Sequence, residues 1–255
     1  MFPYHDENEA LRTSYVTYAI IALNVLVWIV AEGAGSALPM ARAVCNHGLI
    51  AGEFTLRLPP GTPFPMGEGL VCLTDPGRQV LNVLTSMFLH GSWMHLLGNM
   101  WFLKIFGNNI EDSMGHARFV VFYLASGVAA AMAQVFLNPQ SPIPMVGASG
   151  AISGVMGAYL ILYPRVRVFC IVPIGIFPIS IALPAWTMLI YWAGLQAVSG
   201  LIGMMGAQDE GGVAFGAHVG GFLAGVILIK LFARPADVDA HRRQQWQPRR
   251  VVARW

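Results

Sequence analysis

Six apolar runs, separated by more polar stretches, set the pattern of this chain. A helix needs about 20 consecutive apolar residues to cross the hydrocarbon core of a bilayer, and the runs approach that length. Polar residues gather between the first two runs and after the last one. The pattern therefore predicts an all-α, polytopic membrane protein with six transmembrane helices, at residues 15–32, 88–107, 118–137, 148–163, 184–203 and 216–233.

Residues 168–183 are also apolar, but Pro173, Gly175 and Pro178 interrupt them and they run directly into Pro184. Proline removes a helical hydrogen bond and clashes with the preceding turn. We interpret this segment as an interfacial loop that does not span the bilayer. The alternative, a seventh span, would reverse the side on which the C-terminus lies.

Composition supports the membrane class. Of the 255 residues, 56% are hydrophobic and 11% are charged, and the mean hydropathy is +0.59. Soluble domains carry about a quarter charged residues. The net charge is only +2, and no basic stripe with interleaved aromatic residues indicates nucleic-acid binding. Because Asp6, Glu7 and Glu9 precede the first run, we expect an uncleaved span there rather than a signal peptide.

The placement of lysine and arginine predicts the orientation. Twelve of the fifteen basic residues lie in segments that share one side of the membrane, and only Arg42, Arg57 and Arg78 lie on the other. Since basic residues concentrate on the cytoplasmic side, we expect both termini there. The expected parts are a cytoplasmic N-terminal segment 1–14, a membrane domain 15–233 with a large outer loop 33–87, and a basic cytoplasmic tail 234–255.

With this topology, Ser149 begins the fourth span at its outer end, within Gly147-Ala148-Ser149-Gly150. The span has about 16 residues, roughly 24 Å of helix against a core of about 30 Å, so its start should lie below the outer surface. A serine there lies beside unpaired backbone N–H groups, which suit a developing oxyanion. The alternative is tight helix packing, because Gly150 and Gly154 form a small-xxx-small pair.

His218 begins the sixth span at the same outer level, within the glycine-rich segment 216–221. Ionisable side chains are costly in hydrocarbon and are functional candidates by default. Small residues let helices approach closely, so His218 and Ser149 are candidates for a general base and its nucleophile. The alternative is a histidine that bonds to a backbone carbonyl.

His95 and Asn99 are four residues apart in the outer half of the second span, so they share one helical face roughly 6 Å from each other. Both side chains can donate hydrogen bonds, as an oxyanion hole requires. The alternative is hydrogen bonding between helices. His90 lies on another face and is assigned a supporting role, as are Gly147 and Gly150.

Acidic residues limit the chemistry further. We assign no Asp or Glu to the outer half of any predicted span, and we assign Glu111 and Asp112 to an inner turn. This excludes an aspartyl dyad and a Ser-His-Asp triad within the bundle, and leaves a Ser-His dyad. The sequence lacks His-Glu-x-x-His, so we predict neither a zinc site nor another cofactor.

Three ordered motifs resemble those of the rhomboid family of intramembrane serine proteases. They are His-Gly-Ser-Trp-Met-His-Leu-Leu-Gly-Asn at 90–99, Gly-Ala-Ser-Gly at 147–150 and Ala-His-Val-Gly-Gly at 217–221, and the resemblance covers about residues 80–233. It implies Ser149 as nucleophile, His218 as general base, and an oxyanion hole formed by His95, Asn99 and the Ser149 amide.

The resemblance also implies that the protein hydrolyses peptide bonds in or near the transmembrane segments of other proteins, within the lipid bilayer. It further implies that the outer loop lies partly in the membrane and that the fifth span and residues 204–215 gate substrate access. Two features depart from the family pattern. Ser153 stands where many relatives have an aromatic residue, and the first outer loop lacks a Trp-Arg pair.

Cys45 and Cys72 both lie in the predicted outer loop. An oxidising outer compartment permits a disulfide between them, but spacing does not fix geometry, so two unpaired thiols remain the alternative.

Two further functions compete with proteolysis. One is a catalytically inactive rhomboid-like protein that binds membrane clients, and the other is a small transporter or channel, which the lack of charged residues at the span centres disfavours. The compact six-span core resembles bacterial proteins, so we expect a bacterial inner (cell) membrane. Substrate identity and oligomeric state are left open.

Overall fold

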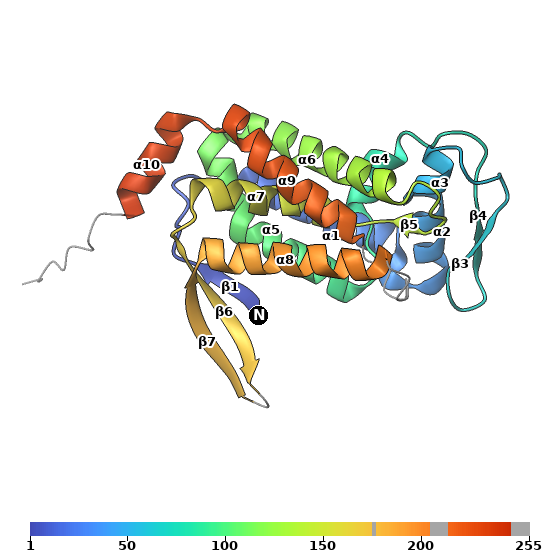
Figure 1. The fold of residues 1–255 in the computed structure, drawn as a ribbon, viewed down its shortest axis with the longest axis horizontal. Coiled ribbons are helices and arrows are strands. Elements are labelled where there is room, and N and C mark those ends of the chain that lie inside the picture. The colour runs from blue at the N-terminus through green and yellow to red at the C-terminus, as the bar shows by residue number, and fades with distance from the viewer. Residues whose placement is uncertain (175–176, 205–213, 246–255) are drawn as a thin grey trace, which may run out of the picture.

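Six long helices form a bundle in the computed structural model, which describes residues 1–174, 177–204 and 214–245 (Figure 1). Each helix overlaps one predicted span, so the six-helix prediction is confirmed, although α5 begins five residues later than its predicted span. The helices are α1 (Tyr15–Val30), α5 (Trp93–Met114), α6 (His116–Leu137), α7 (Ser149–Leu162), α8 (Ala185–Met204) and α9 (Phe215–Phe232).

Helix α5 continues seven residues beyond the predicted end of its span, and Glu111 and Asp112 lie inside it rather than in a turn. The buried carboxylate of Glu111 accepts hydrogen bonds from the backbone N–H groups of Val16 and Thr17, at 2.9 and 2.7 Å, where α1 begins. An acidic group at a helix N-terminus satisfies donors that have no partner within the helix. Because Glu111 is bonded to the start of α1, it can be buried within α5, and the helix continues through Glu111 and Asp112. Gly115, at φ 82°, then reverses the chain into α6.

Helices α7 and α9 cross at close range through their glycines. A Cβ atom added at Gly221 would collide with the Gly150 carbonyl, and one at Gly225 would collide with that of Gly154. Small residues at four-residue spacing allow such an approach between backbones. The packing role considered for Gly150 and Gly154 is therefore present in the fold.

The surface of the bundle is apolar. By length and composition, α6, α8 and α9 are long enough and apolar enough to cross a membrane, while α1 and α7 are apolar but shorter. Large hydrophobic side chains are exposed on these helices, including Phe136, Ile227 and Leu231. Such a surface suits contact with lipid, and the shorter α7 is enclosed within the bundle.

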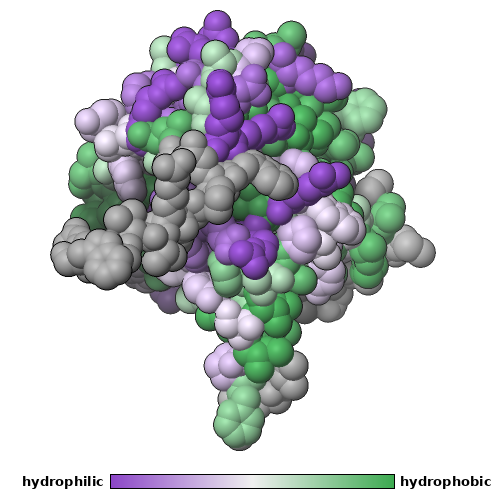
Figure 2. Space-filling model, turned by 90° about the vertical axis from the view of Figure 1, so that its left-hand side faces the viewer, coloured by the Kyte–Doolittle hydropathy of each residue, from purple (hydrophilic) through white to green (hydrophobic). Residues whose placement is uncertain are grey.

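Residues 168–174 and 177–183 lie in the two strands of a β-hairpin, rather than in a loop or a seventh helix. Strands β6 (Arg167–Ile174) and β7 (Phe177–Pro184) pair antiparallel, and β1 (Phe2–Asp6) pairs with β6 in the order β1-β6-β7. The hairpin extends away from the bundle (Figures 1 and 2). Its apolar Phe177 is 70% exposed. The mostly helical class is thus confirmed, with small antiparallel sheets added to it.

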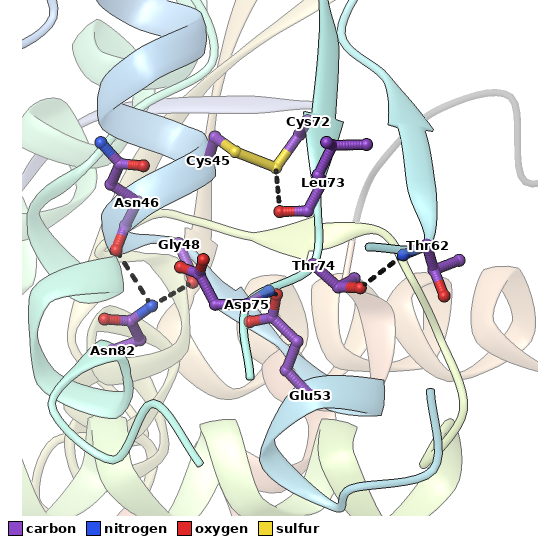
Figure 3. The surroundings of a disulfide bond; sticks show 10 residues. All are labelled: Cys45, Asn46, Gly48, Glu53, Thr62, Cys72, Leu73, Thr74, Asp75 and Asn82. Carbon is purple, nitrogen blue, oxygen red and sulfur yellow. Dashed lines mark hydrogen bonds between the residues drawn. A yellow bond between two sulfur atoms is a disulfide. The ribbon is translucent and has the colours of Figure 1, made fainter. Parts of the chain in front are cut away.

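The region predicted as the outer loop, residues 33–87, contains a disulfide between Cys45 and Cys72 (Figure 3). Nearby, the Asn82 side chain donates to the carbonyl oxygens of Asn46 and Gly48, at 3.2 and 3.0 Å. The elements of this region are η1 (Gly33–Gly35), α2 (Ala37–His47), β2 (Leu49–Ile50), α3 (Ala51–Phe54), β3 (Pro63–Pro65), β4 (Val71–Leu73), α4 (Asn82–Thr85) and η2 (Ser86–Phe88), with β5 (Pro144–Met145) paired to β2.

Hydrophilic residues gather at the opposite end of the bundle, around α10 (Pro235–Gln245) (Figure 2). Here the N-terminal segment meets the start of the C-terminal tail, since Arg12 bonds to Asp237 at 2.5 Å. Asp6 is buried and accepts a hydrogen bond from the Tyr159 hydroxyl at 2.5 Å. Burial raises the pKa of Asp6 to about 7. Residues 246–255 of the predicted tail lie outside the described residues.

Candidate active site

Ser149 and His218 lie in direct contact. Ser149 is the first residue of α7, and His218 lies in the first turn of α9. The Ser149 Oγ is 2.8 Å from the His218 Nε2. The close glycine-mediated crossing of the two helices brings these side chains within one hydrogen bond, although 69 residues separate them in sequence. Such a contact permits the imidazole to take the serine proton.

A cavity of about 630 Å³ opens beside this pair. Its wall includes residues of α5, α6, α7, α8 and α9, so it lies within the bundle. Both polar and apolar side chains contribute, among them His95, Asn99, Met145, Met156 and Trp192. A concave, largely apolar site with a few converging polar groups is the usual form of a ligand-binding or active site.

The predicted oxyanion-hole residues line the same cavity. Ser92 caps α5 by accepting a hydrogen bond from the His95 N–H at 3.1 Å, and this fixes the start of the helix that carries His95 and Asn99. Asn99 is only 7% exposed, and its Nδ2 has no hydrogen-bond partner among the described residues. An unpaired buried donor is costly, so this amide is available to a ligand oxygen.

Gly147 and Gly150 both fill positions that exclude a side chain. Gly147 has φ 122°, which L-residues rarely adopt, and its added Cβ would lie 2.7 Å from the His95 Nε2. An added Cβ at Gly150 would lie 2.7 Å from the Ala130 Cβ. Gly147 thus leaves room for the imidazole of His95, and Gly150 leaves room for α6.

His90 is fully buried, with its ring centroid 5.1 Å from that of His95. Its backbone N–H donates to the Glu32 carboxylate at 2.8 Å. Glu32 is buried just beyond the C-terminal end of α1, so the prediction that no carboxylate lies at the level of the candidate site is wrong. The sequence itself contradicts that prediction, because Glu32 is the last residue of the predicted span 15–32.

Sequence reasoning missed Gln196, whose Oε1 lies 2.7 Å from the His218 Nδ1. Trp192, one turn earlier on α8, has its ring centroid 5.9 Å from the imidazole. Gln196 is a polar side chain within an apolar span, and that was the available signal.

Ser153, which departs from the family pattern, bonds within its own helix. Its hydroxyl donates to the Ser149 carbonyl oxygen at 2.6 Å. The predicted gate, residues 204–215, falls largely on residues 205–213, which lie outside the described residues. Within the described parts of the chain, no group of three His, Cys, Asp or Glu side chains is arranged to hold a metal ion.

Comparison with known proteins agrees with this architecture. A sequence profile of the Rhomboid domain matches residues 77–235. Rhomboid-like protein 11, chloroplastic, of Arabidopsis thaliana is 30% identical over 155 residues, which are 59% of this chain and 52% of that protein. Rhomboid-like protease 5 of Toxoplasma gondii is 32% identical over 177 residues, 66% of this chain and 18% of that protein. Rhomboid protease GluP of Bacillus subtilis is 40% identical over 78 residues, 31% of this chain and 15% of that protein.

The apolar helical bundle defines a multi-pass membrane protein. The chain belongs to the rhomboid family, because the domain profile covers more than half of its length. The matched region spans about half, or less, of the length of these curated relatives.

Proposed function

We propose that this chain is an intramembrane serine endopeptidase that cleaves peptide bonds in or near the transmembrane segments of other membrane proteins. The observation that carries the proposal is the 2.8 Å contact between the Ser149 Oγ and the His218 Nε2 beside a cavity inside the bundle. The family supports it as well, since relatives in Toxoplasma gondii and Bacillus subtilis bear the name protease.

In the first half of the reaction, the Ser149 oxygen attacks the carbonyl carbon of the scissile bond while its proton passes to the His218 Nε2. Negative charge then develops on the carbonyl oxygen. The side chains of His95 and Asn99 and the Ser149 N–H donate hydrogen bonds to it. The intermediate collapses when the carbon–nitrogen bond breaks and the Nε2 proton moves to the leaving amine. The remaining half of the substrate is then an ester on Ser149.

In the second half, a water molecule gives one proton to the His218 Nε2 and attacks the ester carbonyl. The same oxyanion donors stabilise the second tetrahedral intermediate. Its collapse breaks the bond to the serine oxygen, which regains its proton from Nε2. The products are a carboxyl group and an amine, and both side chains return to their starting state, so no cofactor is consumed.

Within this proposal, both termini are cytoplasmic and the serine–histidine pair lies toward the outer side of a bacterial cell membrane. The excess of basic residues in the segments that contain the termini supports this orientation. The polar end formed by the N-terminal segment and α10 would then face the cytoplasm (Figure 2). Substrates would be membrane proteins whose transmembrane segments reach the cavity.

The test is cleavage of a transmembrane substrate by purified variants, together with labelling by a fluorophosphonate probe. The effects of residues that act as one unit are non-additive. The cleavage rate should therefore drop to the same residual level in Ser149→Ala, in His218→Ala and in the double variant. Asn99→Ala should retain measurable turnover, reduced by about 10- to 1000-fold, because other oxyanion donors remain. Ser199→Ala on α8 and His47→Ala in the outer loop are the controls, and both should label normally.

Near-normal cleavage by Ser149→Ala would refute the mechanism. A folded, unaltered chain that neither labels nor cleaves, but binds transmembrane clients, would instead identify an inactive family member.

A further inference from the structure

The imidazole of His218 is held from the side opposite Ser149 by α8. The Gln196 Oε1 lies 2.7 Å from the Nδ1, and the Trp192 ring packs near the imidazole at a centroid distance of 5.9 Å and an angle of 37°. Gln196 and Trp192 are four residues apart, so they share one face of the helix. That face is turned toward α9, because Trp192 also packs near Phe222 at 6.2 Å.

The chemistry of this contact fixes the tautomer of the ring. An amide carbonyl oxygen can only accept a hydrogen bond, so the Nδ1 of His218 must carry the hydrogen that it shares with Gln196. A neutral imidazole has a single N–H, which leaves the lone pair on Nε2. That lone pair faces the Ser149 hydroxyl at 2.8 Å. The other tautomer would place a hydrogen on Nε2, which then could not accept the serine proton.

Aromatic side chains also limit rotation of the ring. Trp192 packs on it from α8, and Phe215 meets it edge-on at 6.4 Å, with an interplanar angle of 88°. The Ser153 hydroxyl, one turn beyond Ser149, is engaged with the Ser149 carbonyl oxygen. The described contacts of the imidazole with α8 and α9 therefore set its orientation, in addition to the bond with Ser149.

We propose that Gln196 is a positioning residue, which keeps His218 in the tautomer and orientation that accept the Ser149 proton, and that Trp192 restricts the same ring. This inference rests on the proposed function. It also ties activity to the docking of α8 against α9. The opposite face of α8 is exposed, with Ile190 50% and Leu201 61% accessible. Movement of α8 away from α9 would break the hydrogen bond between Gln196 and the imidazole.

The first test compares Gln196→Met with Gln134→Met. Methionine keeps an unbranched side chain but lacks the amide acceptor. Gln134 is a matched control because its Oε1 also bonds to the first turn of α9, at the Ala217 N–H, 3.2 Å away, rather than to the ring. We expect Gln196→Met to lower kcat about tenfold with KM unchanged, the effect of one lost hydrogen bond. Gln134→Met should stay within about twofold of the unaltered chain.

The second test is Gln196→Glu, because a carboxylate accepts the same Nδ1 hydrogen and also favours a positively charged ring. We expect the acidic limb of the kcat/KM profile to move to higher pH by about one unit. His95 is the ionisable group that interacts electrostatically with His218 among the described residues, and it is unchanged in every variant. A side chain that merely fills space would not move this limb, and Gln134→Met should leave it in place.

Three outcomes decide the matter. A folded Gln196→Met variant with the kcat of the unaltered chain would overturn the inference, even if Gln196→Glu fails to fold. An unmoved acidic limb in folded Gln196→Glu would overturn it as well. Both results presuppose turnover by the unaltered chain, and its absence would instead overturn the proposed function and this inference with it.

Discussion

The crossing of α7 and α9 makes a distant glycine decisive for the serine–histidine contact. Gly225 lies seven residues after His218, roughly 10 Å along the helix. A Cβ added there would lie 2.6 Å from the Gly154 Cα and closer still to its carbonyl carbon and oxygen. These neighbours are backbone atoms and cannot rotate away. The Gly225→Ala variant must therefore separate the two helices.

The size of the effect follows from this geometry. Restoring an ordinary carbon-to-oxygen contact of roughly 3.3 Å requires a movement of about 1 Å or more. Added to the 2.8 Å between the Ser149 Oγ and the His218 Nε2, this exceeds the length of a hydrogen bond. A misplacement of about 1 Å in a catalytic constellation costs on the order of 100-fold in rate. The overpacking itself costs about 1–3 kcal/mol, so the variant should still fold.

The assay is the kcat for cleavage of a transmembrane substrate in proteoliposomes, with the melting temperature as the measure of folding. Gly194→Ala is the matched control, because an added Cβ on this glycine of α8 meets nothing within 4 Å. It should keep the kcat within about twofold. A folded Gly225→Ala variant with a kcat as high as that of the control would refute the reasoning.

Two further predictions concern the polar end of the bundle. A reporter fused after Arg234 should lie in the cytoplasm, and an external reporter would require the topology to be reversed. Burial raises the pKa of Asp6 from 3.8 to about 7, so the folded state holds this proton more tightly than the unfolded state does. The resulting stabilisation is complete below about pH 4 and is lost as the pH rises to about 7. Asp6→Asn should reduce the decline in melting temperature between these pH values, and an unchanged decline would show that another group causes it.

The positions of the six helices could be predicted because each depends on a local run of apolar residues. The end of α5 could not, since Glu111 and Asp112 appear polar in sequence but are buried by contacts with residues about 100 positions earlier. The hairpin is a similar case. Its prolines, Pro173 and Pro178, argued correctly against a helix, but the pairing of β6 with β1 joins segments more than 160 residues apart.

The same distinction applies to the candidate site. Ser149, His218, His95 and Asn99 all line one cavity, as predicted, because topology alone places them at one depth. Gln196 was missed because its importance depends on the face that α8 turns toward α9, and an apolar span without clear periodicity does not reveal that face. Roles in catalysis stay predictions until the variants are measured.

Helix α7 is enclosed by protein, and this affects how the chain enters a bilayer. Every residue from Gly150 to Tyr159 is buried, and the neighbours of α7 include α8 and α9, which are synthesised after it. Inserted alone, α7 would expose serines and glycines to lipid tails, which neither bond to them nor fill the grooves between them. Membrane insertion is therefore complete only when α9 docks. That last step also brings His218 to Ser149, so under the proposed mechanism a chain without α9 would lack its general base.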